Sequence, residues 1–202
     1  MSTVAPTRLV VGITGATGAP IAVRLLEVLR ELPRVETHLV LSPWGRTTIG
    51  VETPYPVRKV VELADVTHRF GELGATVSSG SYPVSGMVVV PCSMKTLAAI
   101  RHGLADNLIT RAADVTLKER RPLVLVPRET PLSEIHLENM LALARMGARI
   151  VPPMPAFYDN PGSVADIVDH IVMRLLDQLG LPPGETDLAE RWPGLGDVRG
   201  RD

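Results

Sequence analysis

Short apolar runs alternate along the chain with longer stretches in which apolar residues recur every three or four positions. The short runs are rich in Val, Leu and Ile, which is typical of strands buried on both faces of a parallel sheet. They are Leu9–Ile13, Thr37–Leu41, Met87–Val90, Leu123–Val126 and Arg149–Val151. The longer stretches predict helices at about 20–30, 94–102, 107–119, 134–146 and 164–179. This alternation predicts an α/β fold with a layered sheet and right-handed crossovers.

Several predicted helices carry start and stop signals. Short polar side chains that accept hydrogen bonds precede three of them, and glycines follow two of them. The expected caps are Asp106, Ser133 and Ser163 at the N-termini, and Gly147 and Gly180 at the C-termini. In a parallel sheet of this kind, ligands bind beyond the carboxyl ends of the strands, so those ends are where a site is expected.

Two parts of the chain lack a clear period. Residues 52–86 are irregular, although four apolar residues at 57–64 are spaced to line one helix face, and the Ser- and Gly-rich segment 76–86 predicts a loop. From Pro182 onward the chain is rich in Pro, Gly and charge. We therefore expect one domain over residues 1–181 and a partly ordered C-terminal arm over residues 182–202.

Composition excludes several classes of function. Hydrophobic residues make up 45% of the 202 residues, and the net charge of −1 argues against a nucleic-acid binder. The single cysteine, Cys92, excludes an internal disulfide and multi-cysteine metal clusters, and the five histidines are too scattered to predict a metal site. The chain begins without a signal-peptide pattern and has no apolar run of the ~20 residues that a membrane span needs. We therefore expect a cytoplasmic protein with no membrane partner.

The turn after the first predicted strand, Thr14–Pro20, contains two glycines and a hydroxyl. Backbone N–H groups at such a turn lie beside the positive end of a helix, which favours phosphate binding; a tight turn that needs glycine only for its backbone conformation is the alternative. A dinucleotide is disfavoured, because Ile21 replaces the last glycine of the fingerprint and the second strand ends at Ser42 without an acidic residue. A mononucleotide phosphate fits better. Ser42 is then either a helix N-cap or a ligand contact.

Polar residues also follow the third and fourth strands, at Pro91–Thr96 and Pro127–Glu129. Arg128 suits bidentate phosphate binding and Glu129 suits proton transfer, with a solvated ion pair as the alternative. Cys92 is expected to be packing rather than a nucleophile, because no histidine lies near it in sequence. Arg174 lies at the margin of the apolar stripe of the last helix, where it either extends into solvent or faces an anion.

Seven segments, in order, resemble the UbiX/Pad1 family of flavin prenyltransferases, which includes the B components of phenolic-acid decarboxylases. They are Thr14–Ala19 (TGATGA), Pro91–Leu97 (PCSMKTL), Asp106–Val115 (DNLITRAADV), Leu117–Arg121 (LKERR), Pro127–Leu132 (PRETPL), His136–Met140 (HLENM) and Pro155–Tyr158 (PAFY). The resemblance extends from about Leu9 to Leu181, and the ordered set is far more specific than any one segment.

The resemblance implies a flavodoxin-like, Rossmann-like doubly wound sheet in a homo-oligomer, typically a dodecamer, and an FMN site. The implied FMN-binding residues are Gly15, Ala16, Thr17, Ser42, Ser93, Met94, Lys95, Thr96 and Arg128. The implied residues for the second substrate, dimethylallyl monophosphate, are Tyr158, Arg174, Lys118, Arg111, Ser79, Gly80 and Trp192. Lys118 and Arg111 are expected from a neighbouring subunit or nearby, and Trp192 is expected to cover the site.

The implied reaction transfers a dimethylallyl group to N5 and C6 of reduced FMN without a metal, and the product serves a UbiD-type decarboxylase. The implied catalytic residues are Glu129, Glu52, Lys118, Thr17 and Tyr158. Cations and the Tyr158 hydroxyl would stabilise the departing phosphate, and Glu129 would carry a proton. Thr17 occupies a position where the family often has serine. The resemblance therefore does not decide how the Thr17 hydroxyl contacts the flavin near N5.

Two alternatives remain at this stage. FMN-dependent cysteine decarboxylases are disfavoured, because Met154 is followed by Pro155 rather than asparagine and the segment after Ser42 lacks a histidine. A non-catalytic flavin carrier within a decarboxylase is disfavoured, because FMN storage needs no second phosphate site.

Overall fold

The computed structural model describes residues 5–181, 188–192 and 194, and its core is a six-stranded, all-parallel sheet. The strand order is β3-β2-β1-β4-β5-β6, the arrangement of a doubly wound Rossmann sheet. The strands are β1 (Thr7–Ile13), β2 (Val35–Leu41), β3 (Val66–His68), β4 (Gly86–Cys92), β5 (Leu123–Pro127) and β6 (Arg149–Ile150). The predicted fold class is confirmed.

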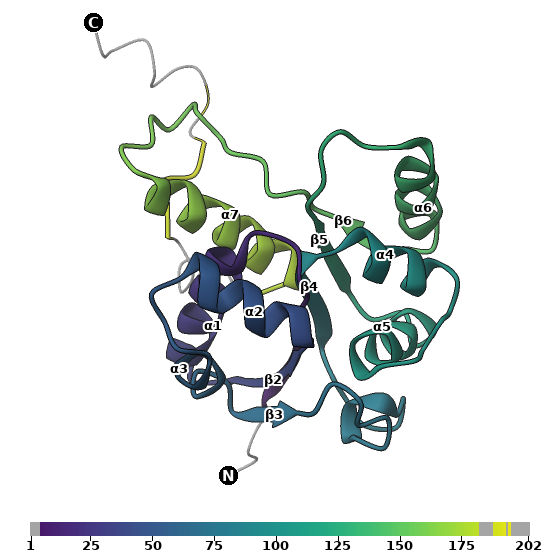
Figure 1. Ribbon diagram of the computed structural model, residues 1–202. Helices are drawn as coiled ribbons and strands as arrows, with labels where there is room; N and C mark the ends of the chain where they lie inside the picture. Colours follow the sequence, from purple (N-terminus) through teal and green to yellow (C-terminus); the bar gives the residue numbers. More distant parts are fainter. Residues whose placement is uncertain (1–4, 182–187, 193, 195–202) are drawn as a thin grey trace, which may run out of the picture.

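Helices cover both faces of the sheet (Figure 1). The helices α1, α2, α3 and α7 contribute to one hydrophobic core, and α4, α5 and α6 contribute to the other. Their bounds are α1 (Ala19–Glu31), α2 (Pro43–Glu52), α3 (Val57–Val61), α4 (Met94–Arg101), α5 (Leu108–Lys118), α6 (Glu134–Arg145) and α7 (Val164–Leu179), with a 3-10 turn at Thr76–Ser78.

The apolar runs form strands because each strand supplies both cores. In β1, Leu9 and Val11 pack against α1 and α7, whereas Val10 packs into the opposite core. Successive side chains of a strand point to opposite faces, so an uninterrupted apolar run is needed when both faces are covered. Each fully buried side chain of this size contributes about 1.5–3 kcal/mol of transfer free energy.

Sequence patterns missed two elements. β3 has three residues, too few to produce a recognisable period. The sequence of α2 contains Trp44, Gly45 and Gly50 among its first eight residues, which is a poor helix composition. The helix forms because Ser42 caps it and Ile49 is fully buried.

The predicted helix caps are largely confirmed. Ser133 and Ser163 each form a capping box, and Gly147 and Gly180 have the positive φ angles expected after a helix. The assignment of Asp106 was wrong by one residue. Asn107 caps α5 by accepting hydrogen bonds from two backbone N–H groups.

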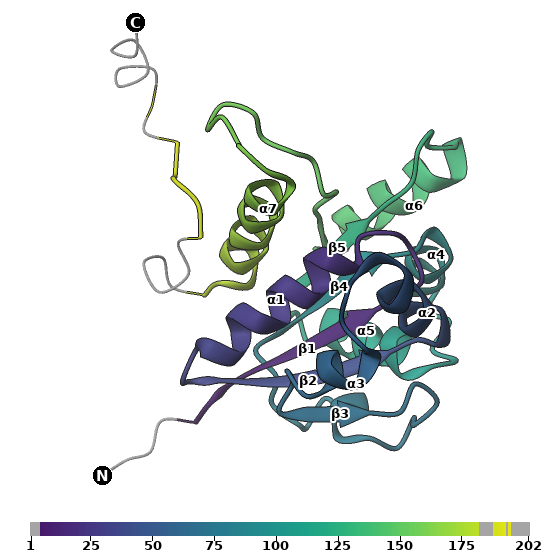
Figure 2. The same ribbon diagram turned by 60° about the vertical axis from the view of Figure 1, so that its left-hand side comes forward.

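Parts of the C-terminal arm lie along α7 (Figure 2). Leu188 packs against the core, Arg191 pairs with Asp177 of α7, and the Trp192 ring contacts the Tyr158 ring. The remaining residues of the predicted arm, 182–187, 193 and 195–202, lie outside the described residues. No helix in the described part of the chain is long and apolar enough to cross a membrane.

Candidate active site

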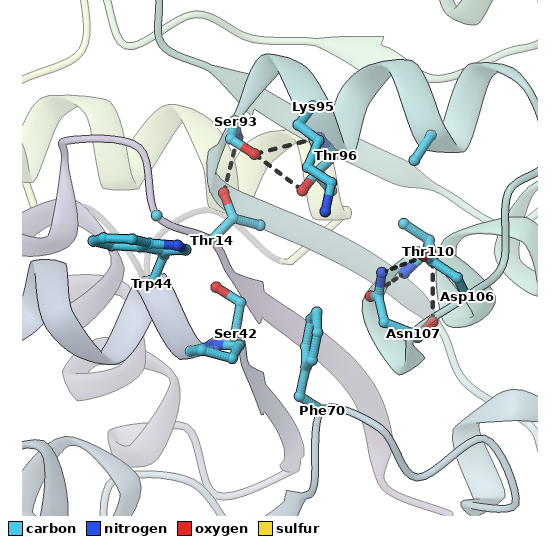
Figure 3. Close-up of a pocket in the computed structure, with 13 residues that line it drawn as sticks. Thr14, Ser42, Trp44, Phe70, Ser93, Lys95, Thr96, Asp106, Asn107 and Thr110 are labelled. Carbon is cyan, nitrogen blue, oxygen red and sulfur yellow. Dashed lines mark hydrogen bonds between the residues drawn. The ribbon is translucent and has the colours of Figure 1, made fainter.

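A cavity of about 410 Å³ lies at the carboxyl ends of β1, β2 and β4 (Figure 3). The strand order reverses between β1 and β4, which is where α/β sheets bind their ligands. The lining comes from the strand-to-helix turns and from the start of α5. It comprises Thr14, Gly15, Ser42, Pro43, Trp44, Phe70, Ser93, Lys95, Thr96, Ala99, Asp106, Asn107 and Thr110.

Thr14 joins the turn after β1 to the turn after β4. Its hydroxyl donates to the Pro91 carbonyl and accepts from the Ser93 N–H, both at 2.8 Å, and the residue is 2% exposed. Ser93 in turn caps α4 by accepting from the Thr96 N–H. The buried hydroxyl therefore helps to hold the α4 N-terminus at the cavity, together with a backbone bond from the Thr14 N–H to the Pro91 carbonyl at 3.3 Å.

The first turn of α2 closes against the end of β1. A Cβ on Gly15 would overlap the side chain of Trp44, and a Cβ on Gly45 would lie 2.6 Å from the Ile13 carbonyl oxygen. Ser42 accepts from the Gly45 N–H at 2.9 Å, as an N-cap, and also lines the cavity. Both roles proposed for Ser42, cap and cavity residue, are therefore compatible.

The turn after β1 has fewer free backbone N–H groups for a phosphate than its glycines predicted. The N–H groups of Gly18 and Ala19 both donate to one carboxylate oxygen of Glu52, at 2.8 Å. Glu52 therefore occupies the position at the α1 N-terminus that a phosphate was expected to take. Within the described residues, the N–H groups of Gly15, Ala16 and Thr17 make no hydrogen bond.

Part of the cavity lining coincides with the residues expected from sequence. Five expected FMN-binding residues line it: Gly15, Ser42, Ser93, Lys95 and Thr96. Ala16, Thr17 and Met94 belong to the same two turns but do not line it. Trp44 could have been predicted, because it comes shortly after the end of β2, and ligands bind beyond the carboxyl ends of such strands. Phe70 was missed because it follows the unrecognised strand β3.

Arg128 and Glu129 lie beside this cavity rather than in its lining. Both are exposed directly after β5, and the Arg128 N–H donates to the Cys92 carbonyl at 3.4 Å, which ties that turn to the end of β4. The Glu129 carboxylate accepts from the Thr130 N–H. Cys92 itself is fully buried, and burial raises the pKa of its thiol to about 12. A thiolate nucleophile is thus disfavoured, as the sequence indicated.

A second group of predicted residues gathers on α7 and the segment before it. The Tyr158 hydroxyl lies 2.9 Å from His170 Nε2, and its ring contacts the Trp192 ring edge-on at 5.0 Å between centroids. Arg174 is exposed and donates to Asp177 at 2.7 Å. In the single chain, Arg174 therefore extends into solvent and forms an ion pair with Asp177, rather than facing an anion site.

The remaining predicted residues lie on α5 and against it, with Arg111 in its first turn and Lys118 at its last residue. Lys118 is exposed and pairs with Glu119, whose pKa this hydrogen bond lowers. Gly80 lies against this pair, since a Cβ there would meet both side chains, and Ser79 precedes it. Arg111 Nε donates to the Ser78 carbonyl at 3.2 Å. Thr110 lines the cavity and Lys118 follows eight residues later, roughly 12 Å along the helix axis. One chain does not bring Lys118 to the cavity.

The cavity suits a flat aromatic ligand with a phosphate. Its volume falls within the range of small-molecule sites, Trp44 and Phe70 offer apolar ring surface, and Lys95, hydroxyls and unbonded N–H groups suit an anion. FMN has this combination, so the donor set fits the group that the sequence predicted. The described residues contain no cluster of three or more acidic, His or Cys side chains able to hold a metal ion.

Comparison with known proteins gives consistent results. The flavoprotein family model matches residues 2–176. A probable UbiX-like flavin prenyltransferase of Streptomyces sp. (strain D7) is 68% identical over 93% of this chain and 92% of that protein.

Two solved structures are also close. A dodecameric FMN-dependent UbiX-like decarboxylase of Escherichia coli O157:H7 has 62% identity and a TM-score of 0.89, covering 94% of this chain and 100% of the other. A UbiX protein in complex with FMN and dimethylallyl pyrophosphate has 56% identity and a TM-score of 0.90, covering 94% and 98%. The FMN-dependent cysteine decarboxylase SpaF, at 20% identity, shares the fold alone. The chain therefore belongs to the flavoprotein family, within its group of UbiX-like flavin prenyltransferases.

Proposed function

We propose that this protein is a flavin prenyltransferase that uses reduced FMN as a substrate and transfers to it a dimethylallyl group. The allylic C–O bond breaks, phosphate leaves with the bonding electrons, and the allyl carbon bonds to flavin N5, which releases its proton. The C=C bond of the allyl group then takes up a proton, its other carbon bonds to C6, and C6 releases its hydrogen as a proton. The observation that carries this proposal is the 56% identity to a UbiX protein crystallised with FMN and dimethylallyl pyrophosphate. The cavity at the topological switch point supports it, since it suits a flavin mononucleotide.

The residues divide into three tasks in this proposal. The turns after β1, β2 and β4, together with Arg128, hold FMN. Tyr158, Arg174 and Trp192 bind the prenyl phosphate, with Lys118, Arg111, Ser79 and Gly80 contributed by another subunit. Glu129 carries a proton to the departing phosphate, and Glu52 shapes the turn that contains Thr17. Charged donors around a leaving phosphate are worth most in an enclosed site, which assembly with a second subunit provides.

Assembly is part of the proposal. The E. coli relative is dodecameric, and α6 here buries only Asn139 and Leu143 among its twelve residues. Its exposed apolar side chains include Ile135, Leu137 and Leu141, which suits a helix that packs against another copy. We further propose a cytoplasmic location and a UbiD-type decarboxylase as recipient of the product. The fully buried single cysteine is consistent with a reducing compartment.

The test is the mass of the flavin after anaerobic incubation with reduced FMN and a prenyl phosphate. We expect the gain of one five-carbon unit, and a larger yield with dimethylallyl monophosphate than with the pyrophosphate. Omission of the prenyl phosphate is the control. Tight FMN binding with unchanged flavin mass for both donors would instead identify a flavin carrier.

A further inference from the structure

A buried histidine of α7 is hydrogen-bonded to the hydroxyl of Tyr158. His170 is 7% exposed, and its Nε2 lies 2.9 Å from the Tyr158 oxygen. The two rings are nearly perpendicular, at 82°, and Tyr158 itself is 46% exposed. Apart from this bond, the Tyr158 hydroxyl has no hydrogen-bond partner among the described residues. The tyrosine therefore has one side fixed by the protein and one side available to a ligand.

The other ring nitrogen of His170 determines which way this hydrogen bond runs. His170 Nδ1 is buried and has no partner in the described part of the chain. A neutral imidazole carries one proton, either on Nδ1 or on Nε2. A proton on Nδ1 would be a buried donor without an acceptor, which is rare and costly. In the other tautomer, the Nε2–H donates to the Tyr158 oxygen, and Nδ1 is left as an unpaired acceptor rather than an unpaired donor.

We propose that His170 is a positioning residue for the prenyl-phosphate site. It donates its Nε2–H to the Tyr158 oxygen, so the phenolic proton points away from α7 toward the ligand. An oxygen that already accepts a hydrogen bond is also the better donor, because hydrogen bonds in a chain polarise one another. The opposite direction would present a lone pair of Tyr158 to a phosphate, which repels an anion. This inference rests on the proposed function.

The surroundings of His170 suit a positioning role. Its helix neighbours Ile171 and Val172 are buried, and the adjacent Asp169 pairs with Arg24 of α1 at 2.6 Å. Tyr158, in contrast, lies in a segment without helix or strand between β6 and α7. A rigid helix therefore fixes the hydroxyl of a residue whose own backbone has no regular hydrogen bonds.

A double-mutant cycle between His170→Phe and Tyr158→Phe tests the proposal. We expect His170→Phe to lower kcat/KM for dimethylallyl monophosphate about tenfold, as for the loss of one hydrogen bond that acts on a charged group. FMN affinity should stay within about twofold, since His170 is not part of the cavity lining. In the Tyr158→Phe background, His170→Phe should cost less than about twofold, because the hydroxyl that it positions is already absent.

His170→Gln keeps a side-chain N–H donor and should recover most of the lost kcat/KM, whereas His170→Leu should behave like His170→Phe and replaces it if that variant does not fold. Equal losses in the presence and absence of the Tyr158 hydroxyl, or wild-type kcat/KM in both apolar variants, would overturn the inference. A wild-type protein that leaves the flavin mass unchanged would instead overturn the proposed function. The two failures are therefore distinguishable.

Discussion

The hydroxyl of Thr14 joins two strand ends that are 77 residues apart in the sequence. It satisfies one backbone donor and one backbone acceptor, and it does so at the wall of the cavity. Removing it leaves the Ser93 N–H without a partner and leaves the Pro91 carbonyl with only the longer bond from the Thr14 N–H, at 3.3 Å. An unpaired buried group costs about 1–3 kcal/mol.

Thr14→Val therefore tests whether this link sets the shape of the FMN site. We expect FMN affinity to fall about tenfold or more, because the turns after β1 and β4 lose both bonds of the hydroxyl and keep only the backbone bond from the Thr14 N–H to the Pro91 carbonyl. Thr14→Ser keeps the hydroxyl and should remain within about threefold of wild type. Titration with FMN, followed by flavin fluorescence, measures both. Equal affinities for Thr14→Val and wild type would contradict this role.

At the scale of elements, α1 begins without a side-chain cap of its own, because Gly18 occupies the N-cap position. Glu52, the last residue of α2, supplies the missing acceptor for the N–H groups of Gly18 and Ala19. Its carboxylate also complements the positive end of the helix dipole. Glu52 thus couples α2 to the turn that contains Thr17.

Glu52→Ala and Glu52→Gln separate this structural role from a catalytic one. Loss of a cap costs about 1–2 kcal/mol, so Glu52→Ala should lower the melting temperature by about 2–6 °C at fixed protein concentration. Glu52→Gln keeps an acceptor oxygen and should lose less stability. If Glu52 also acts in the reaction, Glu52→Gln will lose turnover although its melting temperature stays near that of wild type. A stable, fully active Glu52→Ala protein would exclude both roles.

The pairing of β2 with β3 brings two histidines together. His38 Nδ1 lies 2.9 Å from His68 Nε2, and burial, followed by the nearby His38, lowers the pKa of His68. Glu72 opposes this shift, Glu36 hydrogen-bonds His38, and Tyr82 lies 3.2 Å from His38 Nε2. An unfolded histidine has a pKa of about 6.5, so the unfolded chain binds the proton more readily than the folded one.

This site should therefore stabilise the fold above about pH 6.5 and lose that contribution as the pH falls through the lower folded pKa. We expect the melting temperature of the wild type to decrease between about pH 7.5 and about pH 5.5, and to decrease less in His68→Gln. Thermal unfolding at equal protein concentration compares the two. Identical pH dependence in both proteins would show that the histidine pair does not contribute.

At the scale of the whole molecule, the residues expected to bind the prenyl phosphate are divided between the two faces of the sheet, which α7 and α5 cover respectively. Tyr158 and Arg174 lie at α7, whereas Lys118 lies at the end of α5 remote from the cavity. If both groups serve one site, different subunits must supply them. A heterologous contact between copies permits this arrangement.

Mixed oligomers test this division. Lys118→Ala and Tyr158→Phe subunits, each weakly active alone, should regain up to about a quarter of wild-type activity when co-expressed, because some interfaces then pair two intact surfaces. Tyr158→Phe mixed with Arg174→Ala is the matched control and should regain nothing, since both residues belong to one surface. The measurement is prenylated flavin formed per flavin site. Lack of recovery in the first mixture would show that Lys118 and Tyr158 reach a site from the same subunit, and wild-type activity of Lys118→Ala alone would place Lys118 outside the site.

Much of this protein was predictable from local sequence. The Val- and Leu-rich runs determined that strands would be covered on both faces, and the polar turns after β1, β2 and β4 determined where a ligand would bind. The strands and the cavity at their carboxyl ends were predictable because they rest on periodicity and chain direction, which neighbouring residues encode; that a ligand binds there stays a prediction. Ser133 and Ser163 were identified as caps for the same reason, since a cap acts within its own turn.

Tertiary structure alone decided which distant groups meet. Nothing near Glu52 in sequence indicates that it caps α1, and Phe70 reaches the cavity only because a three-residue strand pairs with β2. The proximity of His170 to Tyr158 likewise depends on how the segment before α7 folds back on that helix. Contacts of this kind depend on how helices and strands pack against one another, not on the spacing of apolar residues within a single element. The sequence alone therefore determined the elements and the position of the cavity, whereas the tertiary structure determined which residues line the cavity.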